Sequence, residues 1–300
     1  MKRRQGLILA ITGASLWGLS GVSSQFLFSV GIMPVWLVGM RLLLAGLMML
    51  IFAWATPKLR KQVLGIWKVK ASRRQLLLFS LFGFLPAQLA FFMTISYSNV
   101  ATAASLQFLN PLFTIIFCAI ACRCFPSKME TSTIFLSLAG TILLVTNGNF
   151  GSLVLSPLAI FWGLLSAVGA VFYSVLPKQL LQEYDATVVV GWGMFLGGLP
   201  LAPIVFTATV PTMTTSTILN IIFVVIVGTL MASITYIKSL EFLPAATAQM
   251  LGSFEPLVAT IVCVLALHES FGMFEILGMI LIVSVVFIQF GMDKVLSLQK

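Results

Sequence analysis

The stretch Gln249-Met-Leu-Gly-Ser-Phe-Glu255-Pro256-Leu-Val-Ala-Thr260 places a carboxylate and a proline inside a long apolar run, from about residue 243 to 267. A carboxylate in such a run is expensive on membrane-insertion scales, and a proline removes a backbone donor and bends a helix. The earlier stretch Gln107-Phe-Leu-Asn110-Pro111-Leu-Phe-Thr114 has the same layout, with Asn110 in the place of Glu255. We therefore interpret the chain as two copies of one unit, each built around a helix break.

The composition predicts an integral membrane protein. Of the 300 residues, 60% are hydrophobic and only 8% are charged, and the mean hydropathy is +1.10. A soluble domain carries roughly 25% charged residues, so this chain has too few charges to cover itself with a polar surface. Hydrophobic runs continue to Phe290 and no short run ends in a clear cleavage site, so a secretory signal peptide does not explain the pattern.

Apolar runs of about 20 residues, the length that crosses a bilayer, predict an all-α protein with ten transmembrane helices. The run from Leu64 to Trp67 is too short to span and lies among basic residues, so we assign it to a loop. The approximate limits of the ten helices are 6–27, 34–55, 74–95, 100–121, 130–147, 156–176, 187–207, 217–238, 244–266 and 272–291.

The basic residues indicate how the chain is oriented. A net charge of +9 can indicate nucleic-acid binding, but here 16 of the 17 Lys and Arg residues fall on one side if the chain alternates across the membrane. The exception, Arg41, lies inside a span. By the positive-inside rule, we predict a multi-pass protein of the cytoplasmic membrane with both termini cytoplasmic and no nucleic-acid partner. The loops on the other side that contain no Lys or Arg are 28–33, 96–99, 148–155, 208–216 and 267–271.

The four cysteines predict neither a disulfide framework nor a metal site. Cys118, Cys122 and Cys124 lie near one helix end, and Cys263 lies elsewhere. A zinc site would need a fourth ligand nearby, and the only histidine, His268, is far away in the sequence. We expect no metal and no cofactor, and the absence of a phosphate-cradling loop gives no indication of direct ATP hydrolysis.

The two halves, 6–147 and 156–291, repeat. Residues 38–47 align with residues 190–199, and residues 100–112 align without a gap with residues 245–257. Because the unit has five spans, the second copy enters the membrane from the opposite side. The sequence thus predicts two inverted five-helix repeats around a central cavity, an architecture of many secondary transporters with a site near the midplane.

Four short motifs occur in order along the chain: Ser15-Leu-Trp17-Gly18, Arg41-Leu-Leu-Leu-Ala, Glu255-Pro256-Leu-Val-Ala, and His268-Glu269 followed by Gly278. Together with the tandem layout they resemble the EamA-domain proteins of the drug/metabolite transporter superfamily, over residues 6–291. The first half departs from the usual pattern, because the segment from Cys122 to Lys128 is inserted before Glu130.

The resemblance implies a transporter, usually an exporter of amino acids or related metabolites. It also implies a basket of helices in which the first four spans of each half line the cavity and the fifth and tenth lie outside. We expect a secondary transporter that exports a small metabolite by alternating access, with the breaks at Pro111 and Pro256 as gating points. An importer or exchanger of drug-like or sugar- or nucleotide-linked solutes is the alternative. The other expected partners are membrane lipid and protons, and the expected assembly is a monomer or a homodimer.

Two intramembrane charges are candidates for coupling or charge pairing. Glu255 can couple protons or bind a substrate ammonium group, or it can satisfy backbone freed by Pro256 or form an ion pair. Arg41 lies about 10 Å inside the external end of its span. It can bind a substrate carboxylate through bidentate geometry, or it can snorkel outward or pair with a carboxylate such as Glu269 or Glu275.

Polar and aromatic side chains at depth are further candidates for substrate binding. Gln107, Asn110 and Thr114 are expected on one helix face, and this stripe suits a polar substrate or interhelical hydrogen bonds. Aromatic faces bind cations and apolar groups. The remaining candidates are Trp17, Gln88, Tyr173, Tyr236 and Gln249.

Two further features are a glutamate near the start of the tenth helix and a short serine motif in the first. Glu269 resembles the helix-entry glutamate of the family and is expected to cap the tenth helix or to interact with its dipole. Gly18-Leu-Ser20-Gly21 matches a short serine motif of intramembrane proteases, but that chemistry needs a base beside the serine. The only histidine is predicted at the membrane edge, so we predict no catalytic residues, and an intramembrane enzyme is the different-class alternative.

Overall fold

The computed structural model describes residues 2–123, 128–149, 155–211, 213–239, 242–243 and 251–298. Every regular element in these residues is helical, which confirms the all-helical prediction. Within this described part of the chain, seven helices are long and apolar enough to cross a membrane: Arg3–Ser29, Pro34–Ala55, Lys70–Tyr97, Val100–Phe117, Pro157–Glu183, Ala186–Thr207 and Thr215–Ser239. Three shorter helices are also apolar: Ile134–Thr146, Phe254–Ala266 and Met273–Val285. The count of ten spans stays a prediction.

The first half contains eight α-helices and one π-helical segment among the described residues. Asn99 begins its fourth span, because the Asn99 side chain accepts a hydrogen bond from the Thr102 N–H at 2.8 Å. The elements are α1 (Lys2–Ser29), α2 (Pro34–Ala55), α3 (Pro57–Lys68), α4 (Lys70–Leu78), the π-helical η1 (Phe79–Phe84), α5 (Leu85–Tyr97), α6 (Val100–Gln107), α7 (Asn110–Cys122) and α8 (Lys128–Thr146).

The second half follows the same order of long and broken helices. Its caps are Ser156, Asp185 and Thr214, whose side chains accept backbone N–H groups of the turns that follow. The elements are α9 (Pro157–Val175), α10 (Leu180–Glu183), α11 (Ala186–Gly198), η2 (Leu199–Leu201), α12 (Ala202–Thr207), α13 (Thr215–Ile222), the π-helical η3 (Phe223–Met231), α14 (Ala232–Ser239), α16 (Phe254–Ala266) and α17 (Met273–Leu298).

The expectation that residues 64–67 belong to a loop is wrong, because they lie in the helix α3. Val63 and Ile66 are buried on its inner side, and the Trp192 indole N–H donates to the Val63 carbonyl at 3.0 Å. The four apolar residues were too few to span a membrane, but they form one face of an amphipathic helix that packs against α2 and α11.

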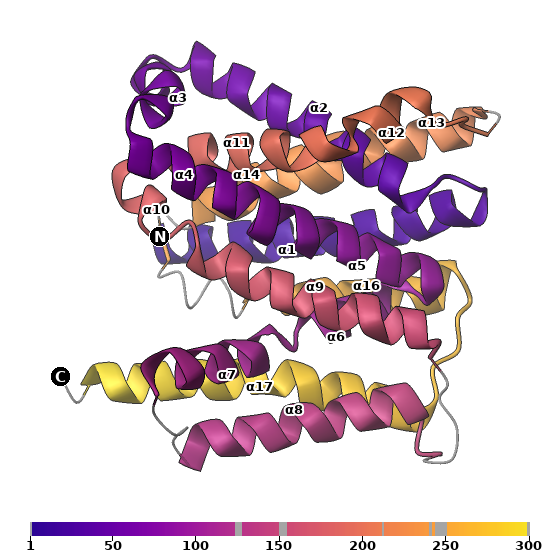
Figure 1. Ribbon diagram of the computed structural model, residues 1–300. Helices are drawn as coiled ribbons and strands as arrows, with labels where there is room; N and C mark the ends of the chain where they lie inside the picture. Colours follow the sequence, from indigo (N-terminus) through magenta and orange to yellow (C-terminus); the bar gives the residue numbers. More distant parts are fainter. Residues whose placement is uncertain are drawn as a thin grey trace.

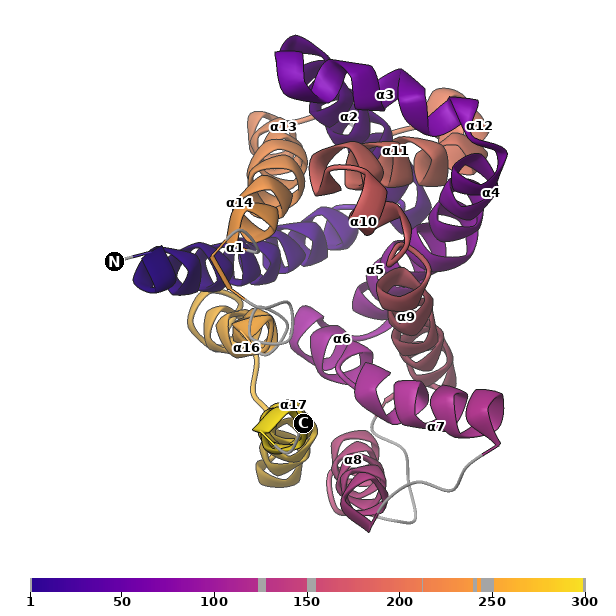
Figure 2. The same ribbon diagram turned by 90° about the vertical axis from the view of Figure 1, so that its left-hand side faces the viewer.

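Helices from the two halves pack against each other in pairs. α2 packs against α11, α6 against α16, and α8 against α17, while α1 packs against α14 and α9 packs against α5. Figure 2 shows α8 and α17 side by side, apart from α2 and α11. This is the position that the resemblance implies for the fifth and tenth spans. The start of α1 and the end of α17 lie on the same side of the molecule as α3 and α10 (Figure 1).

Glycines allow the closest of these contacts. A Cβ atom built on Gly46 would lie 2.5 Å from the backbone nitrogen of Phe195, so α2 and α11 touch backbone to backbone. A Cβ atom on Gly278 would lie 2.6 Å from the Gly140 carbonyl oxygen, so α17 and α8 do the same. Small residues at such crossings are how membrane helices pack closely.

Two irregular features recur at equivalent places in the halves. The fourth span is interrupted by a turn at Phe108 and Leu109 between α6 and α7, and a turn at Gly252 and Ser253 precedes α16. The third span contains η1 around Gly83, and the span made of α13, η3 and α14 contains a π-helical segment around Gly228. Such π-helical segments occur frequently at functional sites.

Candidate functional site

Arg41 is the most deeply buried charge among the described residues. Its side chain is 6% exposed, on a helix that can span the membrane. The guanidinium donates a hydrogen bond to the Gln88 side-chain oxygen, and its central carbon lies 4.0 Å from the centre of the Phe92 ring. Gln88 and Phe92 are four residues apart on α5, so one helix face supplies both partners. Within the described residues the Arg41 Nε atom has no hydrogen-bond partner.

Glu255 lies in the first turn of α16, where the positive end of the helix dipole favours a carboxylate. It is half-buried, and it lies roughly 17 Å along the helix from Ala266, which is about half the thickness of the hydrocarbon core. Gly18 allows α1 to approach here, because a Cβ atom on Gly18 would lie 2.7 Å from the Glu255 carbonyl oxygen. Glu255 and Arg41 interact electrostatically as opposite charges.

The aromatic candidates pack in clusters that join different helices. The Trp17 and Tyr236 rings, from α1 and α14, have centroids 4.9 Å apart, and the electrostatic influence of Glu255 extends to Tyr236. Tyr173 on α9 packs against two phenylalanines of η1, with centroids 5.6 Å from Phe79 and 5.3 Å from Phe84. The π-helical segment thus supplies the aromatic contacts of Tyr173.

The remaining polar candidates are distributed differently from the prediction. Gln107 donates to the Ser166 hydroxyl oxygen at 2.7 Å, so it joins α6 to α9. The expected shared face of Gln107, Asn110 and Thr114 is wrong for Gln107, because the turn at Phe108 and Leu109 separates it from α7. Asn110 and Thr114 do lie one turn apart on α7, where the Thr114 hydroxyl donates to the Asn110 carbonyl at 2.8 Å. Asn110 begins α7 and is half-buried.

The two prolines lie beside the helix breaks. Pro256 is buried in the first turn of α16, and its carbonyl accepts the Thr260 hydroxyl at 2.8 Å. Pro111 belongs to the first turn of α7, and its side chain is outside the described residues. Gln249 also lies outside the described residues.

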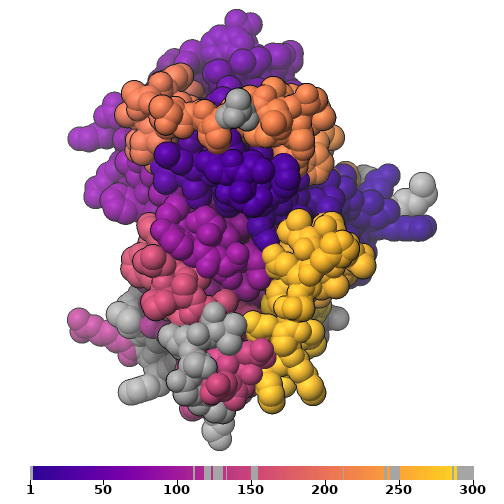
Figure 3. All heavy atoms as spheres, turned by 90° about the vertical axis from the view of Figure 1, so that its right-hand side faces the viewer, coloured from indigo at the N-terminus to yellow at the C-terminus, as the bar shows by residue number. Residues whose placement is uncertain are grey.

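A second polar cluster joins both halves near the start of α6. The Gln25 side-chain amide donates to Glu269, and its oxygen accepts the Val100 N–H at 2.9 Å. Burial raises the pKa of the Glu269 carboxyl, and the Gln25 hydrogen bond opposes that shift. Segments from both halves of the chain meet on this side of the molecule (Figure 3).

These contacts correct two expectations about carboxylates. Arg41 pairs with Gln88 rather than with Glu269 or Glu275. The local cap at the start of α17 is Glu275, which accepts the Gly272 N–H at 2.6 Å, whereas Glu269 bonds to Gln25. Both differences arise because Gln25 and Gln88 lie on other spans, and the sequence does not give distances between spans.

Three contributors were missed by the sequence reasoning, namely Phe92, Ser166 and Gln25. The spacing of Gln88 and Phe92 indicated a shared helix face, but nothing in the sequence indicated that Arg41 would lie above it. Ser166 and Gln25 were two of many polar residues within apolar runs, and only the fold distinguishes them.

The tandem fold and its interior charges agree with a match to known proteins. The sequence pattern of the EamA-like transporter family matches residues 4–146 and again residues 157–290. The chain belongs to the EamA-like transporter family. It is therefore a transporter of the drug/metabolite transporter superfamily and a multi-pass membrane protein.

Relatives of this EamA-like transporter carry the same general description. It is 38% identical to the uncharacterized inner membrane transporter YicL of Salmonella typhimurium, over 94% of this chain and 93% of that protein. It is 24% identical to an uncharacterized transporter of Clostridium kluyveri, over 97% and 94% of the two chains. One solved crystal structure shares its fold, with a TM-score of 0.63 at 17% identity over 97% of this chain and 98% of that one.

Proposed function

We propose that this EamA-like transporter is a secondary active exporter of small metabolites, most specifically amino acids or related zwitterions, that works by alternating access. The observation that carries the proposal is the placement of Arg41 and Glu255. They come from different halves, they bear opposite charges, and the hydrogen-bond partner of Arg41 is Gln88 rather than Glu255. In this proposal both charges bind the opposite charges of the substrate when the binding-competent state forms.

A zwitterion fits this arrangement because it carries both complementary charges. A guanidinium binds a carboxylate with bidentate geometry, and Glu255 supplies the anion for an ammonium group. The Trp17 and Tyr236 rings, which lie 4.9 Å apart beside Glu255, offer faces for the ammonium group or an apolar side chain. In this proposal Arg41 moves its unpaired Nε atom toward the substrate when the binding-competent state forms.

The packing of the helices supports two inverted repeats, 6–147 and 156–291, that rock against each other. In the two repeats α1 is equivalent to α9, and α5 is equivalent to α14, so the contact of α1 with α14 has its counterpart in the contact of α9 with α5. The pairs α2–α11, α6–α16 and α8–α17 each join two equivalent spans. The turns before Asn110 and Glu255 occupy equivalent positions, as discontinuous helices do in many transporters. In this proposal the breaks at Pro111 and Pro256 absorb the motion.

Glu255 is the proposed coupling residue. It differs from Asn110 at the equivalent position of the first half, so only one half offers a group that can gain and lose a proton there. Proton binding to Glu255 would release the substrate ammonium group, and deprotonation would allow the next substrate to bind.

Transport by purified protein in liposomes tests the function. We expect labelled amino acids to exchange across the bilayer and a pH gradient to drive their accumulation. Glu255→Gln should abolish accumulation driven by the pH gradient but leave exchange largely intact, and Arg41→Lys should reduce both because it loses the fork geometry. The matched control is Glu183→Gln, which removes an exposed carboxylate outside this cluster.

Two outcomes would contradict the proposal. A folded protein that moves none of a broad panel of amino acids, but moves a drug-like or sugar-linked solute, supports the alternative substrate class. If the Glu255→Gln variant still responds fully to the pH gradient, Glu255 is not the coupling residue. The enzyme alternative is disfavoured by Ser20, which is buried and has no hydrogen-bond partner in the described part of the chain, and so has no base to activate it.

A further inference from the structure

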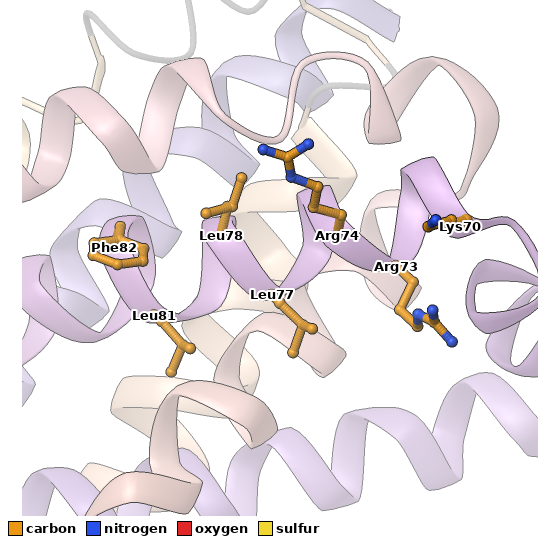
Figure 4. A pocket seen from close by; sticks show the side chains of 7 residues that line it. All are labelled: Lys70, Arg73, Arg74, Leu77, Leu78, Leu81 and Phe82. Atoms are coloured by element: carbon orange, nitrogen blue, oxygen red, sulfur yellow. The ribbon is translucent and has the colours of Figure 1, made fainter.

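The helix that begins at Lys70 has two faces of different character. Its inner face is fixed to the protein: Gln75 donates to the Leu176 carbonyl at 2.8 Å, and Leu76 and Phe79 are buried. Its outer face is exposed and forms a shallow groove of about 360 Å³. The groove is lined by Lys70, Arg73, Arg74, Leu77, Leu78, Leu81 and Phe82 (Figure 4).

Two rows of side chains build this groove. Lys70, Arg74, Leu78 and Phe82 form one row at four-residue spacing, and Arg73, Leu77 and Leu81 form the other. Rows at this spacing are the ridges of a helix surface, and the space between them is a groove. The rows are basic at one end and apolar at the other, and Phe82 is 60% exposed at the apolar end (Figure 4).

The basic end lies at the boundary of a membrane-spanning segment. The helix Lys70–Tyr97 is long and apolar enough to cross a bilayer, and its basic residues are confined to its first turns. The preceding helix α3 adds four exposed basic residues, and residues 57–74 contain no acidic residue. Glu183 of α10 accepts a hydrogen bond from Ser72 at this end at 3.4 Å, but the seven exposed basic residues of residues 57–74 outnumber it. This end therefore has the positive potential that attracts anionic headgroups.

We propose that the groove binds one phospholipid with an anionic headgroup, in the leaflet on the side of α3. The phosphate lies among Lys70, Arg73 and Arg74, and an acyl chain lies between the two rows toward Phe82. By helical rise the groove is roughly 18 Å long from Lys70 to Phe82. Its basic part lies at the headgroups, and its apolar part, from Leu77 to Phe82, extends roughly 8 Å into the hydrocarbon core, where it contacts the first part of an acyl chain. Because α4 continues through η1 into α5, the lipid is bound to the same continuous helix that carries Gln88.

Thermal unfolding of the purified full chain in a non-ionic detergent tests this site. Phosphatidylglycerol and phosphatidylcholine with the same acyl chains are added in separate titrations, with inorganic phosphate in a third. We expect a saturable rise in Tm with phosphatidylglycerol, a much smaller rise with phosphatidylcholine and none with phosphate. Higher salt should weaken the effect of phosphatidylglycerol, because the binding includes exposed charges.

Matched variants locate the effect. Lys70→Gln/Arg73→Gln/Arg74→Gln should raise the phosphatidylglycerol concentration at half-effect by about tenfold or more. Lys58→Gln/Arg60→Gln/Lys61→Gln removes the same charge from α3 and should raise that concentration clearly less than the first triple variant does, since these residues contribute to the surrounding potential but do not line the groove. Equal loss in both triple variants, or an equal rise in Tm with phosphate, would overturn the proposal.

A second variant keeps the test decisive if the loss of three charges prevents folding or insertion. Leu81→Ala/Phe82→Ala keeps every charge and shortens the apolar rows, and it should weaken the response to phosphatidylglycerol several-fold. Native mass spectrometry of the unmodified protein should retain one phosphatidylglycerol molecule in preference to phosphatidylcholine. Retention of both lipids to the same extent contradicts the site.

Discussion

At the scale of single residues, the buried guanidinium of Arg41 depends on Gln88 for a hydrogen bond. One guanidinium nitrogen bonds to Gln88, the ring of Phe92 covers a face, and Nε has no partner in the described part of the chain. A buried donor without a partner lowers the stability of the folded state, so the hydrogen bond to Gln88 is needed to limit the cost of burying Arg41. Gln88 is therefore a positioning residue for the proposed carboxylate-binding group.

We predict that Gln88→Leu destabilises the protein, because leucine fills similar space but accepts no hydrogen bond. The expected loss is roughly 1–3 kcal/mol, seen as a fall of several degrees in Tm in detergent. Gln88→Glu should retain or raise Tm, since it keeps the acceptor and adds an opposite charge. The control is Gln179→Leu at an exposed position, and equal Tm values for the two leucine variants would contradict the prediction.

The candidate residues that the sequence singles out are unusual for their position in the chain. Glu255 and Arg41 stand out because charges are rare in apolar runs, and in the structure these opposite charges influence each other electrostatically. Their neighbours were not found, because Phe92 is one of 25 phenylalanines and becomes distinctive only when another span places Arg41 above it.

At the scale of elements, the sequence predicted the interruptions that have a local cause. Turns precede Asn110 and Glu255 beside Pro111 and Pro256, and a proline acts within its own helix turn. The π-helical segments η1 and η3 and the amphipathic helix α3 were not predicted. Their reasons lie in packing partners far away in the sequence, such as Trp192 against Val63.

The crossing of α2 and α11 gives a prediction at this scale. Gly46→Ala should separate the two helices, because the added Cβ atom would meet the backbone of Phe195, and we expect a loss of roughly 1–3 kcal/mol. Gly65→Ala makes the same change in α3 with no atom within 4 Å, and it should gain up to about 1 kcal/mol from helix propensity. Thermal unfolding measures both, and shifts of the same sign would count against this account.

At the scale of the whole molecule, Glu269 connects the halves. Through Gln25 it joins the segment between α16 and α17 to α1 and to the start of α6. Burial raises the pKa of this carboxyl, so the folded protein binds its proton more tightly than the unfolded chain. The stability contributed by this group is therefore fully present below the usual glutamate pKa and is lost as pH rises through the raised value.

We predict that Glu269→Gln removes this loss while keeping a side chain that can bond to Gln25. The variant should be more stable than the unmodified protein near neutral pH, and the difference in Tm should shrink as the pH is lowered toward about 4. Glu183→Gln, at an exposed carboxylate, serves as the control over the same pH series. A difference that stays constant or grows in acid would refute the assignment.

The opposite signs of Arg41 and Glu255 have an electrical consequence. A zwitterion carries no net charge, and the two side chains together add none while both are ionised. Moving one elementary charge through the membrane potential is worth about 2.3 kcal/mol per 100 mV. The proposed cycle is thus indifferent to voltage while Glu255 keeps its charge, and it becomes electrogenic only through the step in which Glu255 carries a proton across.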